Sequence, residues 1–202
     1  MIEPPFLCPE VPLHLITEAC SLWRATEREL AVVGWPEPYW AFAWAGGQAL
    51  ARHLLDRSEV VQGRSVLDFG AGGGVEAIAA RLAGARSVLA SDLDPVAVTA
   101  IALNAALSGT SVETTTEDLL GRDLGWDVVL VGDVCYDPAL STRLFAWLGP
   151  LAERGATVLI GDPGRGNVPL DRVEAVAVYD APSDVDVRGR YLRATTVYRL
   201  RR

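Results

Sequence analysis

The chain has 202 residues, half of them hydrophobic and 22% charged, as expected of a globular protein with a sizeable core. Its formal net charge of −8 argues against a nucleic-acid partner, because binding bare nucleic acid needs clustered cations. No apolar run is long enough to cross a bilayer, and the first residues lack a basic leader and an apolar signal core. We therefore expect a cytoplasmic protein with no membrane partner. The cysteines, Cys8, Cys20 and Cys135, are spaced too widely for a disulfide framework or a metal site.

The N-terminal part of the chain shows two helical patterns. Residues 19–31 have the apolar spacing of an amphipathic helix. Residues 35–47 are rich in proline and tryptophan, and they lead into a second helix that runs to about Leu55. Tryptophan is costly to leave in water, so Trp40 and Trp44 are expected to pack in the core or to line a pocket.

The remainder of the chain alternates short apolar runs with helical patterns. Helices are predicted from Val75, from Pro95 with Asp94 as N-cap, and over residues 140–151 with Gly155 near the end. The apolar runs between them are typical of buried parallel strands. Their ranges are 65–69, 87–91, 111–116, 127–132 and 156–161.

The alternation of strands and helices stops near the C-terminus, where the sequence predicts two strands joined by a loop, at residues 173–179 and 191–200. Such a pair indicates an antiparallel hairpin at the edge of the sheet. Strand–helix alternation before it predicts an α/β fold with a Rossmann-like, doubly wound sheet. We expect this core to occupy residues 57–202 as a single domain, with residues 1–56 forming a helical extension that packs on it.

A glycine-rich turn follows the first predicted strand. Gly70, Gly72 and Gly74 stand between a strand and a helix, where glycine lets the backbone approach a ligand closely. A dinucleotide fingerprint would place its third glycine at position 75, which is Val75 here. Asp68, at the end of the strand, would repel a pyrophosphate and attract a cation. S-adenosylmethionine carries an ammonium and a sulfonium and no phosphate, so it is favoured over a nicotinamide cofactor.

Acidic residues also follow the next two strands. Asp92 is placed to accept hydrogen bonds from ribose hydroxyls, with Leu93 beside it in the same site. Asp118 is placed to accept a hydrogen bond from the adenine amine, while Leu119 packs on the ring. Each acid alone is typical of a surface, but three at the carboxyl ends of successive parallel strands indicate one binding edge.

The fourth strand ends in the residues GDVCYD (132–137), which carry Asp133 and Tyr136 to the place where the methyl group would be transferred. Methyl transfer to an amine needs a neutral, aligned acceptor and exclusion of water. Asp133 is suited to orient the amine, and Tyr136 to position it or assist proton loss. The alternative is that Asp133 caps the following turn and Tyr136 packs.

The sequence resembles the seven-β-strand S-adenosylmethionine-dependent methyltransferases. Among them it is most similar to bacterial relatives of the electron-transfer-flavoprotein β-subunit lysine methyltransferase. The motifs that carry the resemblance are PYWAFAWAGGQALARHLLD (38–56), VLDFGAGGG (66–74), SDLDP (91–95), GDVCYD (132–137) and GDPGR (161–165). The family commonly has G-S-G-L where this chain has Gly72–Val75, and residues 183–191 match no pattern of the family.

The resemblance implies a seven-stranded sheet of order 3-2-1-4-5-7-6 with the seventh strand antiparallel. It implies that Asp133 and Tyr136 line the acceptor-lysine site and that Trp44 contacts the cofactor. We expect the N-terminal extension to close the cofactor site, with S-adenosylhomocysteine as the product. The leading hypothesis is N-methylation of a lysine on a folded protein, with the electron-transfer-flavoprotein β subunit as a candidate.

Two other functions remain open on the sequence. One is methylation of a small amine or heterocyclic nitrogen, which predicts a lidded pocket where a protein substrate predicts an open acceptor channel. The other is a module that binds S-adenosylmethionine without turnover, against which the intact Asp68, Asp92 and Asp133 argue.

Overall fold

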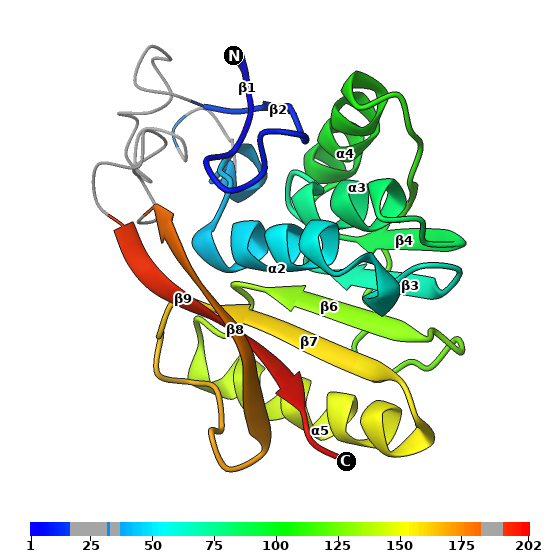
Figure 1. The fold of residues 1–202 in the computed structure, drawn as a ribbon, viewed down its shortest axis with the longest axis vertical. Helices are drawn as coiled ribbons and strands as arrows, with labels where there is room; N and C mark the ends of the chain where they lie inside the picture. The colour runs from blue at the N-terminus through cyan, green and yellow to red at the C-terminus, as the bar shows by residue number, and fades with distance from the viewer. Residues whose placement is uncertain (17–31, 33–36, 183–191) are drawn as a thin grey trace.

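The computed structural model describes residues 1–16, 32, 37–182 and 192–202 (Figure 1). The helix predicted over residues 19–31 and the segment 183–191 lie outside the described residues. A two-stranded ribbon of β1 (Ile2–Glu3) and β2 (Leu13–His14) precedes the main sheet. No helix among the described residues is long and apolar enough to cross a membrane.

Seven strands form one sheet in the order β5-β4-β3-β6-β7-β9-β8. The first five pair in parallel, whereas β9 lies antiparallel to both β7 and β8, so the expected strand order is confirmed. The polar edge strand β5 is shorter than predicted, and β8 extends further, to Pro182. The bounds are β3 (Ser65–Phe69), β4 (Ser87–Ser91), β5 (Glu113–Thr115), β6 (Val128–Gly132), β7 (Thr157–Asp162), β8 (Val173–Pro182) and β9 (Leu192–Leu200).

Helices begin and end where the local residues dictate. The Asp94 carboxylate accepts a hydrogen bond from the Val96 N–H at 2.8 Å, directly before Pro95, as predicted. Gly155, with φ of 112°, ends the last helix, also as predicted. The helical elements are η2 (Tyr39–Ala41), α2 (Ala45–Asp56), η3 (Ser58–Val60), α3 (Val75–Leu82), α4 (Pro95–Leu107) and α5 (Pro138–Arg154).

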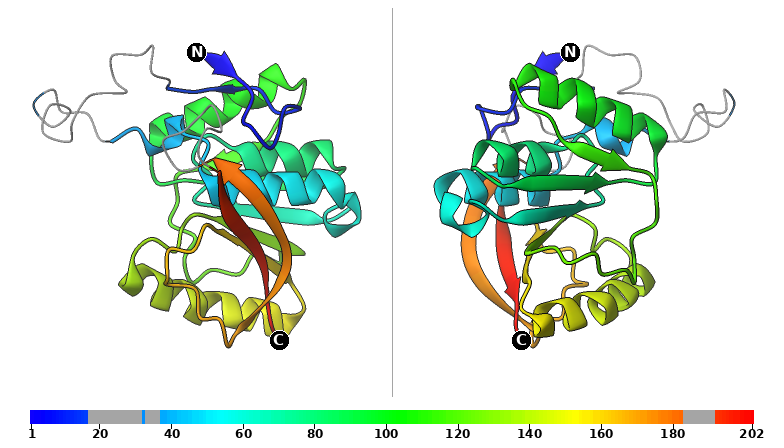
Figure 2. Two further views of the ribbon diagram at one scale, coloured as in Figure 1. Left: turned by 60° about the vertical axis from the view of Figure 1, so that its left-hand side comes forward. Right: turned by 90° about the vertical axis from the view of Figure 1, so that its right-hand side faces the viewer.

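The two faces of the sheet are buried against different helices, as the views in Figure 2 show. Along β6, Val129 and Val131 pack in the cluster that contains the apolar side chains of α5. Val128 and Leu130 point the other way, into the cluster formed with α2 and α3. Alternating side chains buried on both faces explain why β6 reads as a continuous apolar run.

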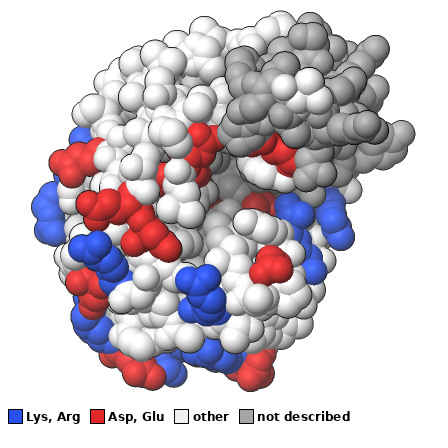
Figure 3. All heavy atoms as spheres, turned by 180° about the vertical axis from the view of Figure 1, so that it is seen from behind, with Lys and Arg blue, Asp and Glu red and all other residues white. Residues whose placement is uncertain are grey.

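Helix α4 has an unusual outer face, because it contains no charged residue from Pro95 to Leu107. Val96, Leu103 and Leu107 are 48%, 54% and 39% exposed along it. Seen from behind in Figure 3, the surface at the upper left, over α4, is free of charge, and charged side chains gather lower down. A helix that is apolar all round is usually buried on both sides, so α4 presents an uncommonly apolar surface to solvent.

Candidate functional site

A hollow opens at the carboxyl edge of the parallel strands, where β3 and β6 end beside the first turns of α2 and α3. Its empty volume is about 330 Å³, part of it open to solvent. Ligands of open α/β sheets bind at this edge, which makes the hollow the candidate site. The turn after β3 forms one wall, and the others include Leu13, Phe42, Trp44, Gly47, Glu76 and Gly132.

The glycine-rich turn is held in a left-handed backbone. The φ angles of Gly70, Gly72 and Gly74 are 73°, 52° and 83°, which glycine adopts without strain. A side chain at Gly73 would place its Cβ 2.8 Å from the Trp40 carbonyl oxygen. The four glycines therefore allow both the tight turn and its close contact with the segment before α2.

The N-terminal extension is tied to this turn through Asn104 of α4. Its side-chain Nδ2 donates to the Gly73 carbonyl oxygen at 2.8 Å, and its Oδ1 accepts from the His14 N–H at 2.8 Å. Asn104 is completely buried, so this link is shielded from water. Sequence reasoning missed Asn104, although a polar residue within an otherwise apolar helix was a signal that could have identified it.

Asp92 fixes the turn from the end of β4. Its Oδ2 accepts a hydrogen bond from the Gly72 N–H at 2.8 Å, and its Oδ1 accepts one from the Asp94 N–H at 3.0 Å. The side chain remains half-buried, and its neighbour Leu93 is 67% exposed. The structure thus brings Asp92 to the glycine turn, as expected of neighbouring strand ends.

Asp68 lies behind the turn and is completely buried. Its Oδ2 accepts a hydrogen bond from the Ala77 N–H at 2.9 Å, and it caps α3 because the N-cap residue Gly74 has no side chain to do so. Its other oxygen has no hydrogen-bond partner. Burial raises the pKa of Asp68 to about 6.

Glu76, which sequence reasoning also missed, is buried beside Asp68. Burial, together with the nearby carboxyl groups of Asp68 and Asp133, raises the pKa of Glu76 well above its usual range. A charged residue in the first turn of an apolar helix was the available signal. Asp68 and Glu76 are called the buried acid pair below.

The strand-end residues after β5 lie less directly at the site. Asp118 is exposed, and its Oδ1 accepts a hydrogen bond from the Leu120 N–H at 3.0 Å. Leu119 is 2% exposed and packs in the core with Trp126. Its side chain therefore presents almost no surface on which a ring can lie.

Asp133 directly follows Gly132, which lines the hollow, and each of its oxygens accepts hydrogen bonds. Oδ2 accepts from the Gly46 N–H through a short contact and from the Gly47 N–H at 3.3 Å. Oδ1 accepts from Arg165 Nε at 2.9 Å and from a terminal guanidinium nitrogen at 2.5 Å. The φ of Asp133 is 57°, a left-handed conformation that aspartate tolerates better than most residues.

These contacts answer the alternative raised for Asp133 and Tyr136. The Asp133 carboxylate caps α2, and the next helix is capped by Asp137 at 2.7 Å from the Leu140 N–H. Tyr136 does not pack in the core, because it is 65% exposed. Tyr136 is thus exposed to solvent, whereas Asp133 is buried and held by hydrogen bonds.

Trp44 connects the two sides of the site. Its ring lines the hollow, its Nε1 donates to the Tyr39 carbonyl oxygen at 2.8 Å, and the Arg165 guanidinium lies 5.8 Å from the ring centroid. Arg165 therefore joins Trp44 to Asp133 by stacking on one and pairing with the other. The sequence around Arg165, GDPGR, does not indicate that this side chain contacts Trp44 and Asp133.

The start of α2 meets the ends of β6 and β7 through main-chain atoms. A Cβ at Gly46 would lie 2.3 Å from the Gly161 carbonyl oxygen, and one at Gly132 would lie 2.9 Å from the Gly47 Cα. Only glycine permits this approach, which delivers the first N–H groups of α2 to Asp133.

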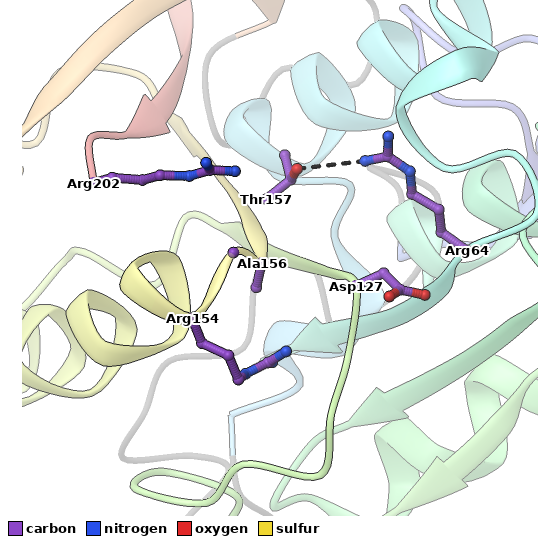
Figure 4. A pocket seen from close by; sticks show the side chains of 7 residues that line it. Arg64, Asp127, Arg154, Ala156, Thr157 and Arg202 are labelled. Atoms are coloured by element: carbon purple, nitrogen blue, oxygen red, sulfur yellow. Dashed lines mark hydrogen bonds between the residues drawn. The ribbon is translucent and has the colours of Figure 1, made fainter.

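A larger hollow lies at the opposite, amino edge of the sheet (Figure 4). Arg64, Arg154 and Arg202 extend around it, with Arg64 within 3.4 Å of the Thr157 hydroxyl. Arg154 is paired with Asp123 at 2.7 Å. This hollow has neither a glycine turn nor strand-end acids, so the carboxyl-edge hollow remains the candidate site.

Comparison with known proteins identifies the relatives of this chain. The ribosomal protein L11 methyltransferase (PrmA) family matches residues 49–132. The electron transfer flavoprotein beta subunit lysine methyltransferase of Danio rerio is 40% identical over 200 residues, which cover 96% of this chain and 76% of that protein. The Xenopus laevis protein of the same name is 46% identical over 164 residues, covering 79% of this chain and 65% of its own length.

The chain belongs to the electron transfer flavoprotein beta subunit lysine methyltransferase family. Solved structures agree on the fold of this family member. A ribosomal protein L11 methylase from Lactobacillus delbrueckii matches with a TM-score of 0.53 at 22% identity, covering 78% of this chain and 79% of the other. The magnesium protoporphyrin IX methyltransferase of Synechocystis, solved with bound S-adenosylmethionine, matches with a TM-score of 0.54 at 16% identity, covering 77% and 78%.

This family member is therefore an enzyme, a methyltransferase with S-adenosylmethionine as its cofactor. The site fits that group, because the unpartnered oxygens of Asp68 and Glu76 are buried acceptors that lack donors. An ammonium supplies such donors, and a molecule without phosphates is not repelled by the acids. Within the described residues, no three His, Cys, Asp or Glu side chains are placed to hold a metal ion.

Proposed function

We propose that this chain transfers a methyl group from S-adenosylmethionine to the ε-amine of a lysine on an acceptor protein. The first candidate is the β subunit of electron transfer flavoprotein, the protein for which the relatives are named. The observation that carries the proposal is a carboxylate fixed by hydrogen bonds, Asp133, directly after the lining residue Gly132, with an exposed phenol, Tyr136, three residues further along the chain.

On the cofactor side, we assign the glycine turn of residues 70–74 to the close approach of the ligand. Asp92 accepts from ribose hydroxyls, with Leu93 beside it, and Asp118 accepts from the adenine amine. Because Leu119 is buried, it would pack beneath the residues that contact the adenine ring and would not contact the ring over a large area itself.

We assign the methionine half of the cofactor to the space between Trp44 and Asp68. The N-terminal extension closes the site, a role supported by the link from His14 through Asn104 to Gly73.

When bound, S-adenosylmethionine supplies an electrophilic methyl group on sulfur. The Asp133 carboxylate attracts the acceptor amine, and the Tyr136 hydroxyl orients it and assists loss of its proton to solvent. The nitrogen–carbon bond then forms as the sulfur–carbon bond breaks, leaving S-adenosylhomocysteine. Because four donors already occupy the Asp133 oxygens, the amine reaches Oδ1 by displacing Arg165.

The exposure of Tyr136 favours a protein substrate over a small amine, because a small acceptor calls for a closed pocket. The presence of aspartate at position 133, next to the lining residue Gly132, argues against a module that only binds the cofactor. Both alternatives are outcomes of the same experiment.

The test is to incubate the chain with labelled S-adenosylmethionine and purified electron transfer flavoprotein, and separately with host lysate. All 18 basic residues of the chain are arginine, so label on lysine cannot come from methylation of the enzyme's own side chains. We expect label on a lysine of the β subunit, mapped by peptide mass spectrometry. Label only in small molecules refutes the lysine assignment, and no transfer at all favours the binding module.

A matched pair of variants distinguishes the role of the Asp133 carboxylate in methyl transfer from the effect of removing one negative charge from the protein. Asp133→Asn should abolish most transfer, whereas Asp171→Asn, which removes one exposed carboxylate elsewhere, should leave the rate unchanged. Equal rates for the two variants overturn the role given to Asp133.

A further inference from the structure

The side chain of Glu76 fills a space that two glycines leave open. A Cβ at Gly132 would lie 2.2 Å from Glu76 Oε1, and one at Gly47 would lie 3.9 Å from Oε2. The carboxyl group therefore lies between the end of β6 and the first turn of α2, against the wall of the hollow. Glu76 is 3% exposed, and its Oε1 is a buried acceptor with no hydrogen-bond partner.

The charges around Glu76 leave the buried acid pair without a cation. Asp133 faces it but is paired with Arg165, Asp92 acts on Asp68, and Glu76 in turn acts on the Cys8 thiol. Within the part of the chain that the structure describes, no salt bridge reaches either member. Two buried carboxyl groups in contact retain a proton, because ionising both would place like charges together.

We propose that Glu76 is a cofactor-binding residue that receives the ammonium group of the methionine half of S-adenosylmethionine, in exchange for the proton that the buried acid pair holds. The proposal rests on the cofactor side of the proposed function and extends it to a residue outside the glycine turn. An ammonium brings three N–H donors and a full positive charge, which are what the unpartnered oxygens of Glu76 and Asp68 lack. Binding favours the ionised pair, so the displaced proton passes to the buffer.

The test uses titration calorimetry with two ligands. S-adenosylhomocysteine carries the ammonium, whereas 5′-methylthioadenosine has the adenosine and thioether without the amino-acid group. In Glu76→Gln, which mimics the protonated carboxyl, S-adenosylhomocysteine should bind about tenfold to a hundredfold more weakly. The affinity for 5′-methylthioadenosine should be unchanged, which also shows that the variant is folded. Glu153→Gln, an exposed position on α5, is the matched control and should leave both affinities unchanged.

The second readout is the proton balance, obtained by repeating the titration in phosphate and in Tris, whose ionisation enthalpies differ. The unmodified chain should release protons on binding S-adenosylhomocysteine near neutral pH, and Glu76→Gln should release fewer. Unchanged affinity and unchanged proton release in Glu76→Gln overturn the inference while leaving the proposed function intact. If the unmodified chain binds neither ligand, the cofactor side of the proposed function fails instead.

Discussion

Gly46 and Gly47 are adjacent residues in the first turn of α2, yet the structure predicts opposite effects for the same substitution. In Gly46→Ala the new Cβ would lie 2.3 Å from the Gly161 carbonyl oxygen and 2.6 Å from Asp133 Oδ2. The first neighbour is main chain and the second is a carboxylate held by Arg165, so α2 must shift away from β7. In Gly47→Ala the nearest atom would be Val75 Cγ1 at 3.4 Å, an ordinary contact.

The magnitudes follow from these contacts. Overpacking costs about 1 to 3 kcal/mol, and loss of a buried hydrogen bond to the Asp133 carboxylate adds about 1.5 kcal/mol or more. For a chain of this size, Gly46→Ala should therefore lower the melting temperature by at least about 5 °C. Gly47→Ala should raise it by about 1 to 3 °C, because alanine loses less backbone entropy on entering a helix.

The assay is thermal unfolding of both variants without ligand, followed by circular dichroism and calorimetry. Similar shifts for the two variants, or a melting temperature for Gly46→Ala equal to that of the unmodified chain, would refute the main-chain contact between α2 and β7. Because the two positions are neighbours, differences in helix propensity cannot account for opposite signs.

Three further outcomes are expected. Asp133→Asn should reduce turnover by about a hundredfold with S-adenosylhomocysteine affinity nearly unchanged, and a wild-type rate measured with labelled cofactor would contradict this. Burial raises the pKa of both Cys8 and Cys135 to about 12, so neither thiol should react with iodoacetamide at pH 8 until the protein unfolds, as peptide mass spectrometry can show. Raised carboxyl pKa values stabilise the fold at low pH and lose that effect as pH rises, so the ligand-free melting temperature should fall from about pH 5 to about pH 8. Glu76→Gln should flatten this dependence, and an identical slope in both proteins would show that the buried acid pair is not its source.

Much of the fold could be predicted because its signals are local. Strands buried on both faces appear in the sequence as short apolar runs, and the helix that starts at Pro95 follows an acidic cap. The acidic strand ends could be grouped because parallel strands bring their carboxyl ends to one edge. Asp92 does lie at the glycine turn as this reasoning requires.

The surroundings of Asp133 could be anticipated only in part, because its contacts join residues that are far apart in the chain. Asp133 accepts from the start of α2, 87 residues away, and from Arg165, 32 residues away. Neither the hydrophobic periodicity nor the spacing of motifs in the sequence predicts contacts between residues so far apart. Glu76 and Asn104 were missed for a related reason: each is one of few polar residues in a mostly apolar helix, and the sequence does not say whether such a residue faces water or a buried partner.

The contact of α2 with β7 through main-chain atoms has a consequence for how this enzyme can diversify. At Gly46 and Gly161 there is no side chain for a mutation to trim or reshape, and any addition displaces the helix. The contact between Gly46 and Gly161 therefore cannot be altered by small changes of side-chain size. Substitutions that preserve this contact are therefore confined to the residues around it, and Gly46 and Gly161 themselves are expected to stay glycine.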